Sequence, residues 1–317
     1  MATQIRDDVT GLGAQENDSK VDLLQYYEEA GPDYEAWSQH FHMHFGYYRR
    51  GLRPWQLEPM LDEMTRQVVR RLALPEAQSE PVCSEPIREQ KKYRHRLLDM
   101  GCGLGASLRL VAAENPDIVV DGVTLVPWQV RKAKQMTEDS GLADRARVHQ
   151  QSYTATEFGP ATFDGAYAIE SSCHAEGLHK RAFIEEAARV LKPGSSLVVA
   201  DGFFKGRPPR GVFLSWVTRV VSSNWAVETF AEIGSFTKAL REAGFQDIEV
   251  EDASWRIAPS VFHVPRVTLG FLLRRLIKER LRLSRVRWGH LLACVLSPVL
   301  GMARARFGYF IVSAKKK

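Results

Sequence analysis

A glycine-rich turn at residues 101–105 constrains the fold of this chain more than any other feature. A short apolar segment at residues 97–100 leads into it, and an apolar helical pattern follows from residue 106. A strand, a tight turn and a helix N-terminus in this order form a nucleotide-binding crevice at the carboxyl edge of a parallel sheet. Gly101 and Gly103 let the backbone turn sharply and approach a ligand, because neither carries a Cβ atom. The pattern predicts an α/β fold with a Rossmann-like sheet.

A second buried strand is predicted at residues 118–124. In dinucleotide-binding enzymes this strand ends in an acid that binds the ribose hydroxyls, but Thr124 stands here. The runs Asp-Met-Gly-Cys-Gly at 99–103 and Gly-Val-Thr-Leu-Val-Pro-Trp-Gln at 122–129 resemble those of class I S-adenosylmethionine-dependent methyltransferases. Within this class they are most similar to the tocopherol and sterol methyltransferase groups. The alternative is an ordinary βαβ unit that binds another nucleotide.

The resemblance implies a seven-stranded sheet whose last strand is antiparallel, with S-adenosylmethionine as the cofactor at its carboxyl edge. It also places the adenine near residues 151–153, where the family usually has an acid and this chain has Ser152. The residues that the resemblance implies for cofactor binding are Asp99, Gly101, Cys102, Gly103, Gly105, Thr124, Leu125, Gln129, Ser152, Tyr153 and Glu170.

Apolar periodicity and stop signals predict the remaining elements. Further strands are expected at residues 146–150, 163–169, 196–201, 247–255 and 307–313, and helices at 55–74, 178–191 and 235–243. The expected parts of the chain are a disordered lead (1–20), an N-terminal helical lid and linker (21–95), the cofactor-binding core (96–258), a basic and apolar helical cap inserted between strands six and seven (259–306), and the last core strand with a basic tail (307–317).

The N-terminal part is rich in aromatic residues between positions 26 and 55. The resemblance implies that this segment folds over the cofactor and forms one wall of a substrate pocket. We therefore predict Tyr26, Tyr27 and His44 as pocket residues, and Trp216 and Trp225 as further lining. The alternative is that these aromatic side chains only pack a small helical subdomain.

The loop after the strand at 163–169 begins Glu170-Ser171-Ser172-Cys173-His174 and faces the reaction zone at the carboxyl edge of the sheet. It resembles the Glu-x-x-x-His pattern of the sterol and tocopherol enzymes, so Glu170 and His174 are the candidate catalytic residues. Either could act as a general base on a phenol, amine or activated carbon. With an alkene acceptor, Glu170 could stabilise a carbocation and accept its proton. Alternatively, Glu170 caps a turn and His174 packs in the core.

Composition places the chain among ordinary globular proteins, since 44% of its 317 residues are hydrophobic and 26% are charged. Its four cysteines show neither CxxC spacing nor a pairing pattern. A reducing, cytoplasmic compartment and no metal site are therefore expected.

The net charge of +5 is unevenly distributed along the sequence. Residues 266–306 hold ten Lys or Arg and one acid, whereas the first 265 residues carry a net charge of −7. Residues 267–283 predict a basic amphipathic helix, and the apolar residues 291–302 are too few to span a bilayer, which needs about twenty. Residues 267–302 are expected to form a cap that contacts an anionic membrane peripherally. Alternatively, the basic face is only solvated.

These patterns predict a methyltransferase acting on a lipophilic small molecule, such as an isoprenoid, sterol-like or prenylated aromatic compound, with methylation of carbon favoured. Oxygen or nitrogen methylation of a phenolic or alkaloid-type compound is the alternative. A nucleic-acid methyltransferase is disfavoured, because residues 170–173 do not match the Asn/Asp-Pro-Pro-Tyr/Phe loop of enzymes that methylate base amino groups. No nucleic-acid partner is therefore expected. A non-catalytic cofactor-binding scaffold is the remaining alternative, and the sequence does not indicate an oligomeric state.

Overall fold

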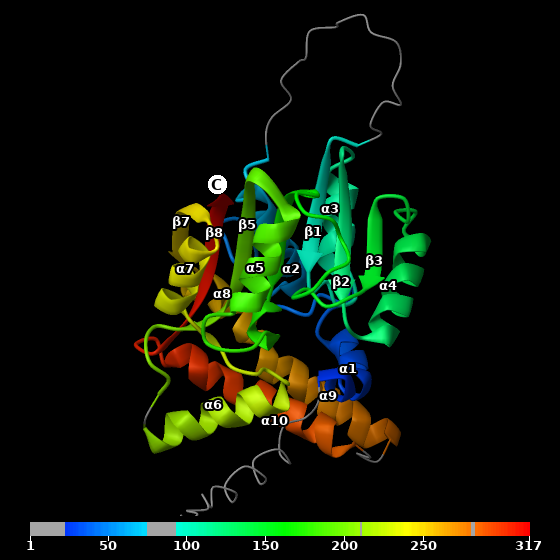
Figure 1. Ribbon diagram of the computed structural model, residues 1–317. Helices are drawn as coiled ribbons and strands as arrows, with labels where there is room; N and C mark the ends of the chain where they lie inside the picture. The colour runs from blue at the N-terminus through cyan, green and yellow to red at the C-terminus, as the bar shows by residue number, and fades with distance from the viewer. Residues whose placement is uncertain (1–22, 75–92, 210, 280–282) are drawn as a thin grey trace, which may run out of the picture.

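A computed structural model describes residues 23–74, 93–209, 211–279 and 283–317. Its centre is a twisted sheet with strand order β3-β2-β1-β4-β5-β8-β7, and β6 pairs with β5 beside this path (Figure 1). The strands are β1 (His95–Met100), β2 (Ile118–Thr124), β3 (Ala146–Gln150), β4 (Phe163–Ile169), β5 (Leu191–Phe204), β6 (Ala231–Glu232), β7 (Phe245–Asp252) and β8 (Phe307–Lys316).

The sheet has the strand directions that the resemblance predicts. Strands β1 to β5 pair in parallel, whereas β8 lies antiparallel between β5 and β7. The Rossmann-like seven-stranded methyltransferase sheet is thereby confirmed. The strand predicted at 247–255 ends earlier, at Asp252, because the Asp252 carboxylate accepts the Ser254 backbone N–H at 3.0 Å and helix α8 begins at Ser254.

Helices cover both faces of the sheet, and α7 follows the capping carboxylate of Glu232. They are α1 (Leu23–Glu29), η1 (Gly31–Ala36), α2 (Leu57–Arg70), α3 (Ala106–Glu114), α4 (Pro127–Asp139), η2 (Ser172–His174), α5 (Arg181–Val190), α6 (Val212–Asn224), α7 (Ile233–Glu242), α8 (Ser254–Val261), α9 (His263–Glu279) and α10 (Arg285–Met302).

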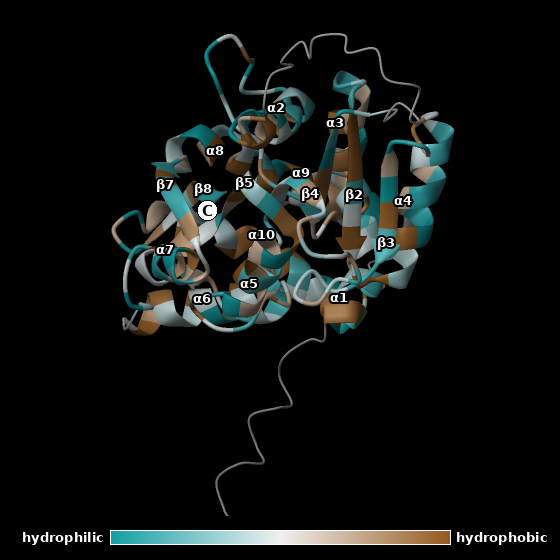
Figure 2. Cartoon of the chain, turned by 45° about the horizontal axis from the view of Figure 1, so that its top comes forward, coloured by the Kyte–Doolittle hydropathy of each residue, from teal (hydrophilic) through white to brown (hydrophobic). Residues whose placement is uncertain are grey.

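The core has two layers because successive side chains of a strand point to opposite faces. Leu97 packs in the layer that includes residues of α2, α3 and α4, and Leu98 in the layer that includes residues of α5 and α7. Figure 2 shows the apolar central strands between helices with polar outer faces. This core holds the carboxyl ends of β1, β2 and β4 in fixed positions.

Three helices gather at the end of the molecule beyond the carboxyl edge of the sheet. They are α6, α9 and α10 (Figure 1), and α10 contacts α6, α9 and α1. α6 was not predicted, although its tryptophan was singled out. No helix among the described residues is long and apolar enough to cross a membrane. The predicted lead at 1–20 and most of the linker at 75–95 lie outside the described residues.

The predicted helix at 267–283 corresponds to α9, but its faces differ from the prediction. Phe271 is buried, whereas Leu269, Leu273, Ile277 and Arg274 are exposed. The apolar side chains of α9 are therefore divided between the interior and the surface. Phe271, on the interior side, lines a cavity of the candidate active site.

Candidate active site

The glycine turn is closely packed on both sides. Gly101 has φ +103°, and a Cβ atom on it would lie 2.4 Å from Ser171 Cβ. Gly103 has φ +52°, and a Cβ atom there would lie 3.1 Å from Met43 Sδ. Position 101 needs both a left-handed backbone and the absence of a side chain, and glycine is the residue that meets both needs.

A cavity of about 400 Å³ lies above this turn, at the carboxyl ends of β1, β2 and β4. It brings together ten of the eleven residues predicted for cofactor binding. These lining residues are Asp99, Gly101, Cys102, Gly103, Thr124, Leu125, Gln129, Ser152, Tyr153 and Glu170. Gly105 does not line it. Gly105 is the residue directly before α3 and has φ +72°, so the chain enters this helix through one residue in the left-handed conformation.

We call this cavity the cofactor cavity. The Asp99 carboxylate in its wall has an oxygen that lacks a hydrogen-bond donor. Its Oδ2 atom is buried and has no hydrogen-bond partner among the described residues. Burial raises the pKa of Asp99 to about 7. A buried carboxylate oxygen without a partner is costly unless a ligand supplies a donor. Together with the glycine turn, Asp99 fits a cofactor that carries an ammonium group, as S-adenosylmethionine does.

The side of the cavity at the end of β2 is polar where Thr124 and Gln129 meet. The Thr124 hydroxyl donates to the Gln129 side-chain oxygen at 2.7 Å. Leu125 presents an exposed apolar surface beside them, and Tyr153 donates its hydroxyl proton to the Ser171 carbonyl at 3.0 Å. These groups provide flat apolar and polar contacts suited to a nucleoside.

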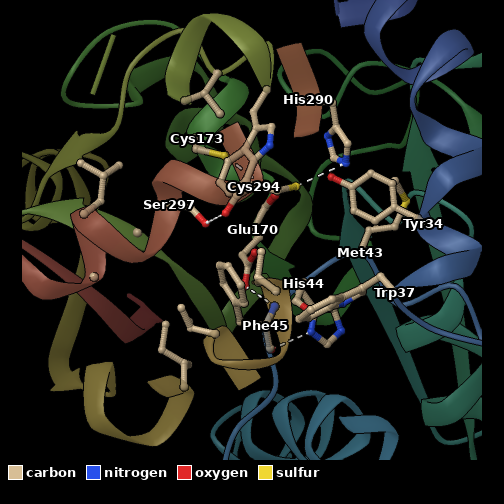
Figure 3. Close-up of a pocket in the computed structure, with 18 of the residues that line it drawn as sticks. Tyr34, Trp37, Met43, His44, Phe45, Glu170, Cys173, His290, Cys294 and Ser297 are labelled. Atoms are coloured by element: carbon tan, nitrogen blue, oxygen red, sulfur yellow. Dashed lines mark hydrogen bonds between the residues drawn. The ribbon is translucent and has the colours of Figure 1, made fainter. Parts of the chain in front are cut away.

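Glu170 lies at the start of the loop after β4 in a left-handed conformation, with φ +50°. Its Oε1 atom accepts the Phe45 backbone N–H at 2.7 Å and the Tyr309 hydroxyl at 2.9 Å. Burial raises the pKa of Glu170 to about 8, although the Phe45 N–H opposes this shift. Figure 3 shows Glu170 pointing toward the segment that carries Phe45. A cation bound nearby would favour the ionised carboxylate.

His174 is held as a neutral ring. Its Nδ1 atom lies 2.9 Å from the Ala226 carbonyl, which only accepts, so Nδ1 carries the proton. Its Nε2 atom therefore accepts the Tyr27 hydroxyl, 3.0 Å away. Burial lowers the pKa of His174 to about 4. The ring can accept a proton at Nε2 only if Tyr27 gives up this contact.

A second cavity, of about 180 Å³, is shown in Figure 3. It adjoins the first, because the two share lining residues. Its walls are mainly apolar, and we call it the acceptor cavity. The predicted residues Tyr26, Tyr27, His44 and Trp225 line it. The residues that line both cavities are Tyr27, Met43, His44, Glu170 and His174. Both candidate catalytic side chains thus lie where the two cavities meet.

Trp216 lies outside both cavities, contrary to the prediction. It is exposed on α6, with its ring centroid 6.3 Å from that of Phe213. The helix turns its buried face, with Val217 and Val221, toward α10 instead. The sequence could not show this, because α6 itself was not predicted.

The far end of the acceptor cavity is formed by residues that sequence reasoning missed. His290 on α10 lies 2.8 Å from the Tyr26 hydroxyl through its Nδ1 atom. Tyr26 also lies 3.1 Å from the Tyr34 hydroxyl, oxygen to oxygen. Asp33 accepts two hydrogen bonds from Arg287, at 2.8 and 2.6 Å. The aromatic residues 26–48 were a usable signal, whereas nothing in the sequence marked His290.

The fold and the site together place two adjoining cavities at the carboxyl edge of the sheet, one at the glycine turn and one with mainly apolar walls. Comparison with known proteins identifies the family to which the chain belongs. The family described as a methyltransferase domain matches residues 97–194. Over 233 residues the chain is 32% identical to "O-methyltransferase cnsE" of Penicillium expansum, covering 72% of this chain and 75% of that protein.

Two further matches are informative. The chain is 42% identical over 109 residues to "24-methylenesterol C-methyltransferase 2" of Oryza sativa subsp. japonica, which covers 34% of this chain and 29% of that protein. The solved cyclopropane synthase MmaA2 from Mycobacterium tuberculosis matches with a TM-score of 0.75 at 16% identity, covering 95% of this chain and all of that one (100%). The chain belongs to the class I S-adenosylmethionine-dependent methyltransferases that act on small molecules.

Proposed function

We propose that this enzyme methylates a lipophilic small molecule, at carbon in preference to oxygen or nitrogen, with Glu170 as the proton acceptor. The observation that carries the proposal is the meeting of a largely apolar acceptor cavity with the cofactor cavity at Glu170. When bound, S-adenosylmethionine supplies an electrophilic methyl group on a sulfonium. Asp99 and the glycine turn would hold the amino-acid end of this cofactor, and Thr124, Leu125 and Tyr153 its nucleoside.

Orientation is the first contribution of the acceptor cavity. Apolar walls exclude water and align a hydrophobic acceptor with the methyl donor, which can lower the barrier by about 7–11 kcal/mol. The cavity volume of about 180 Å³ limits how much of the acceptor is enclosed. Compact ring systems or the reactive end of a longer isoprenoid fit this description.

Proton removal is the second contribution. Both hydrogen bonds of the Glu170 carboxylate fall on Oε1, so Oε2 is the oxygen that can take a proton. If an alkene carbon were the acceptor, its π electrons would form the new carbon–carbon bond as the methyl carbon–sulfur bond of the cofactor breaks, which would leave a thioether as the leaving group and a carbocation on the acceptor. The aromatic rings of Trp37 and Phe45, which line the cavity, stabilise this charge, and Glu170 then accepts the proton that restores the double bond.

Methylation at oxygen or nitrogen is the second candidate, favoured by the similarity to an O-methyltransferase. Glu170 would then take the proton of the acceptor group directly. His174 could do so only after an acceptor hydroxyl replaces Tyr27 at Nε2, because that atom is occupied. Structure determination of the product distinguishes the two candidates.

We also propose that the surface formed by α9 contacts an anionic membrane peripherally. Leu269, Leu273 and Ile277 recur at intervals of four along the exposed side of α9, together with Arg274. Apolar side chains that enter the headgroup region and a basic side chain that meets anionic lipid support this contact. A lipophilic acceptor would reach the enzyme from such a surface.

A transfer assay tests the acceptor class. The protein is incubated with methyl-labelled S-adenosylmethionine and a cell extract, and the label is partitioned between an organic phase and precipitated macromolecules. Label in the organic phase supports a lipophilic acceptor and yields product for locating the new methyl group. Label that precipitates with RNA or protein would overturn the small-molecule acceptor.

A further inference from the structure

A buried hydrogen-bond donor in the wall of the acceptor cavity has no acceptor. Trp225 directly follows α6, and its side chain lines this cavity. Its Nε1 atom is buried and makes no hydrogen bond to any residue that the structure describes. Because an indole N–H only donates, a bound molecule that supplies a lone pair would remove the cost of burying it.

The thiol of Cys294 on α10 is a polar neighbour of this N–H. Burial raises the pKa of Cys294 to about 12, and the Trp225 N–H opposes this shift. A thiol sulfur is only a weak acceptor, so it does not satisfy the indole. Cys294 Sγ also lies 3.5 Å from His290 Nε2, and Figure 3 shows Cys294 directed toward His290. These three side chains therefore lie together in a mainly apolar wall.

Two tyrosines continue this row of polar groups. The Tyr26 hydroxyl lies 2.8 Å from His290 Nδ1 and 3.1 Å from the Tyr34 hydroxyl, oxygen to oxygen. Burial lowers the pKa of His290 to about 4, so the ring is neutral at pH 7 and carries one proton. With this proton on Nδ1, the ring donates to Tyr26, Tyr26 donates to Tyr34, and Tyr34 has its own proton to give. With the proton on Nε2, the directions reverse and the Tyr34 oxygen can accept.

Position and charge define what this row could bind. We call its five members the polar cluster, and they are Tyr26, Tyr34, Trp225, His290 and Cys294.

The polar cluster lies away from the place where the two cavities meet, because its members line the acceptor cavity and none lines the cofactor cavity. Among the described residues that line the acceptor cavity, none is Lys or Arg, whereas Asp33, Glu170 and Asp201 are acids. An anionic group would find no opposite charge in this wall, and burying an unpaired charge is costly. The wall therefore suits an uncharged oxygen.

We propose that the polar cluster binds an uncharged hydroxyl or carbonyl oxygen of the acceptor molecule, with the Trp225 N–H as donor and the Tyr34 hydroxyl as second partner. This inference rests on the proposed function and specifies its acceptor as a neutral, oxygen-bearing lipophile. The bound oxygen is not the methylated atom, because it lies away from Glu170. Trp225 and Tyr34 are thus specificity-determining residues.

Proton NMR of the indole N–H groups tests this oxygen subsite with three probes that share one carbon skeleton. Geraniol carries a hydroxyl, 2,6-dimethylocta-2,6-diene carries no oxygen, and geranic acid carries a carboxylate at neutral pH. Trp225→Phe removes one of the seven indole signals and so assigns it. Geraniol should move the Trp225 N–H signal downfield, as a hydrogen bond does, and the hydrocarbon should not.

The dissociation constants from the same titrations give a second readout. Trp225→Phe should weaken geraniol about two- to tenfold more than it weakens the hydrocarbon, as expected for loss of one neutral hydrogen bond. Tyr34→Phe should also weaken geraniol more than the hydrocarbon, and it serves if Trp225→Phe does not fold. Trp216→Phe, which alters an exposed tryptophan outside both cavities, should change neither affinity.

The outcomes separate the oxygen subsite from the proposed function. An unmoved Trp225 signal with geraniol bound, or equal weakening of geraniol and the hydrocarbon by Trp225→Phe, would overturn the subsite while leaving a lipophilic acceptor intact. Tighter binding of geranic acid than of geraniol would overturn the uncharged character of the bound oxygen. If the unaltered protein bound neither geraniol nor the hydrocarbon, the lipophilic acceptor itself would be wrong and the subsite with it.

Discussion

At the scale of one residue, burial raises the pKa of Glu170, the proposed proton acceptor. Its pKa near 8 means that the side chain is mostly a neutral acid at pH 7 before the cofactor binds. A sulfonium favours the carboxylate, whereas the thioether of S-adenosylhomocysteine carries no such charge. Binding of S-adenosylmethionine should therefore become stronger relative to S-adenosylhomocysteine as the pH rises.

We predict that the dissociation constant of S-adenosylhomocysteine divided by that of S-adenosylmethionine increases between pH 6.5 and 9. The transition should lie near the pKa of Glu170, about 8. The sign follows because raising the pH ionises the acid that attracts the sulfonium. Glu170→Gln should give a flat ratio. Calorimetry at several pH values measures it, and a ratio independent of pH in the unaltered protein would contradict the placement of Glu170 beside the sulfur.

The glycine turn supplies a second prediction at this scale. Gly101 and Gly141 both have positive φ, but a Cβ atom at Gly141 meets nothing within 4 Å, whereas at Gly101 it meets Ser171. Gly141→Ala should cost about 1 kcal/mol of unfolding free energy and leave cofactor affinity intact. Gly101→Ala should weaken S-adenosylhomocysteine at least tenfold, since β1 and the Ser171 loop must separate. Equal effects of both variants would contradict the close packing.

At the scale of single elements, α9 has apolar residues on both its buried and its exposed sides. We predict that the protein sediments with vesicles containing phosphatidylserine, and that Leu273→Glu with Ile277→Glu reduces the bound fraction about tenfold, because two apolar contacts are lost. Val250→Glu, on the exposed side of the edge strand β7, is the matched control and should change nothing. Unchanged sedimentation of the α9 variant would exclude this surface as the membrane contact.

Elements with a strong local pattern were predictable from the sequence, and those defined by distant partners were not. The strand ends at Met100 and Thr124 follow from apolar runs that stop at turn residues. The chain turns at the end of β7 where the Asp252 carboxylate accepts the Ser254 backbone N–H, and the orientation of Trp216 depends on how α6 packs on α10. His290 reaches the acceptor cavity only because α10 lies beside α1 in the folded chain.

At the scale of the whole molecule, the N-terminal segment is tied to the C-terminal insertion across the acceptor cavity. Asp33 is almost fully buried and is bonded twice to Arg287, and Arg275 lies 3.7 Å away. Such a contact holds η1 against α9 and α10 and closes one end of the cavity.

We predict that Arg287→Met lowers the unfolding free energy by about 3 kcal/mol, because a buried carboxylate loses its bidentate partner. Asp33→Asn combined with Arg287→Met should recover part of this loss, since the uncompensated charge is removed. Chemical denaturation measures the unfolding free energy of the single variants and of the double variant. A double variant as unstable as the sum of the two single variants would show that the pair is not coupled.

The most direct test of the proposed function compares Glu170→Gln with the matched control Glu185→Gln, whose side chain is exposed on α5. Single-turnover methyl transfer and S-adenosylhomocysteine affinity are measured for each. We predict that Glu170→Gln slows transfer by about 10²–10⁴-fold, the usual contribution of a general base, with cofactor affinity changed by less than about threefold. Glu185→Gln should behave as the unaltered enzyme. Normal transfer rates with weakened cofactor binding in Glu170→Gln would contradict the role of Glu170 as proton acceptor.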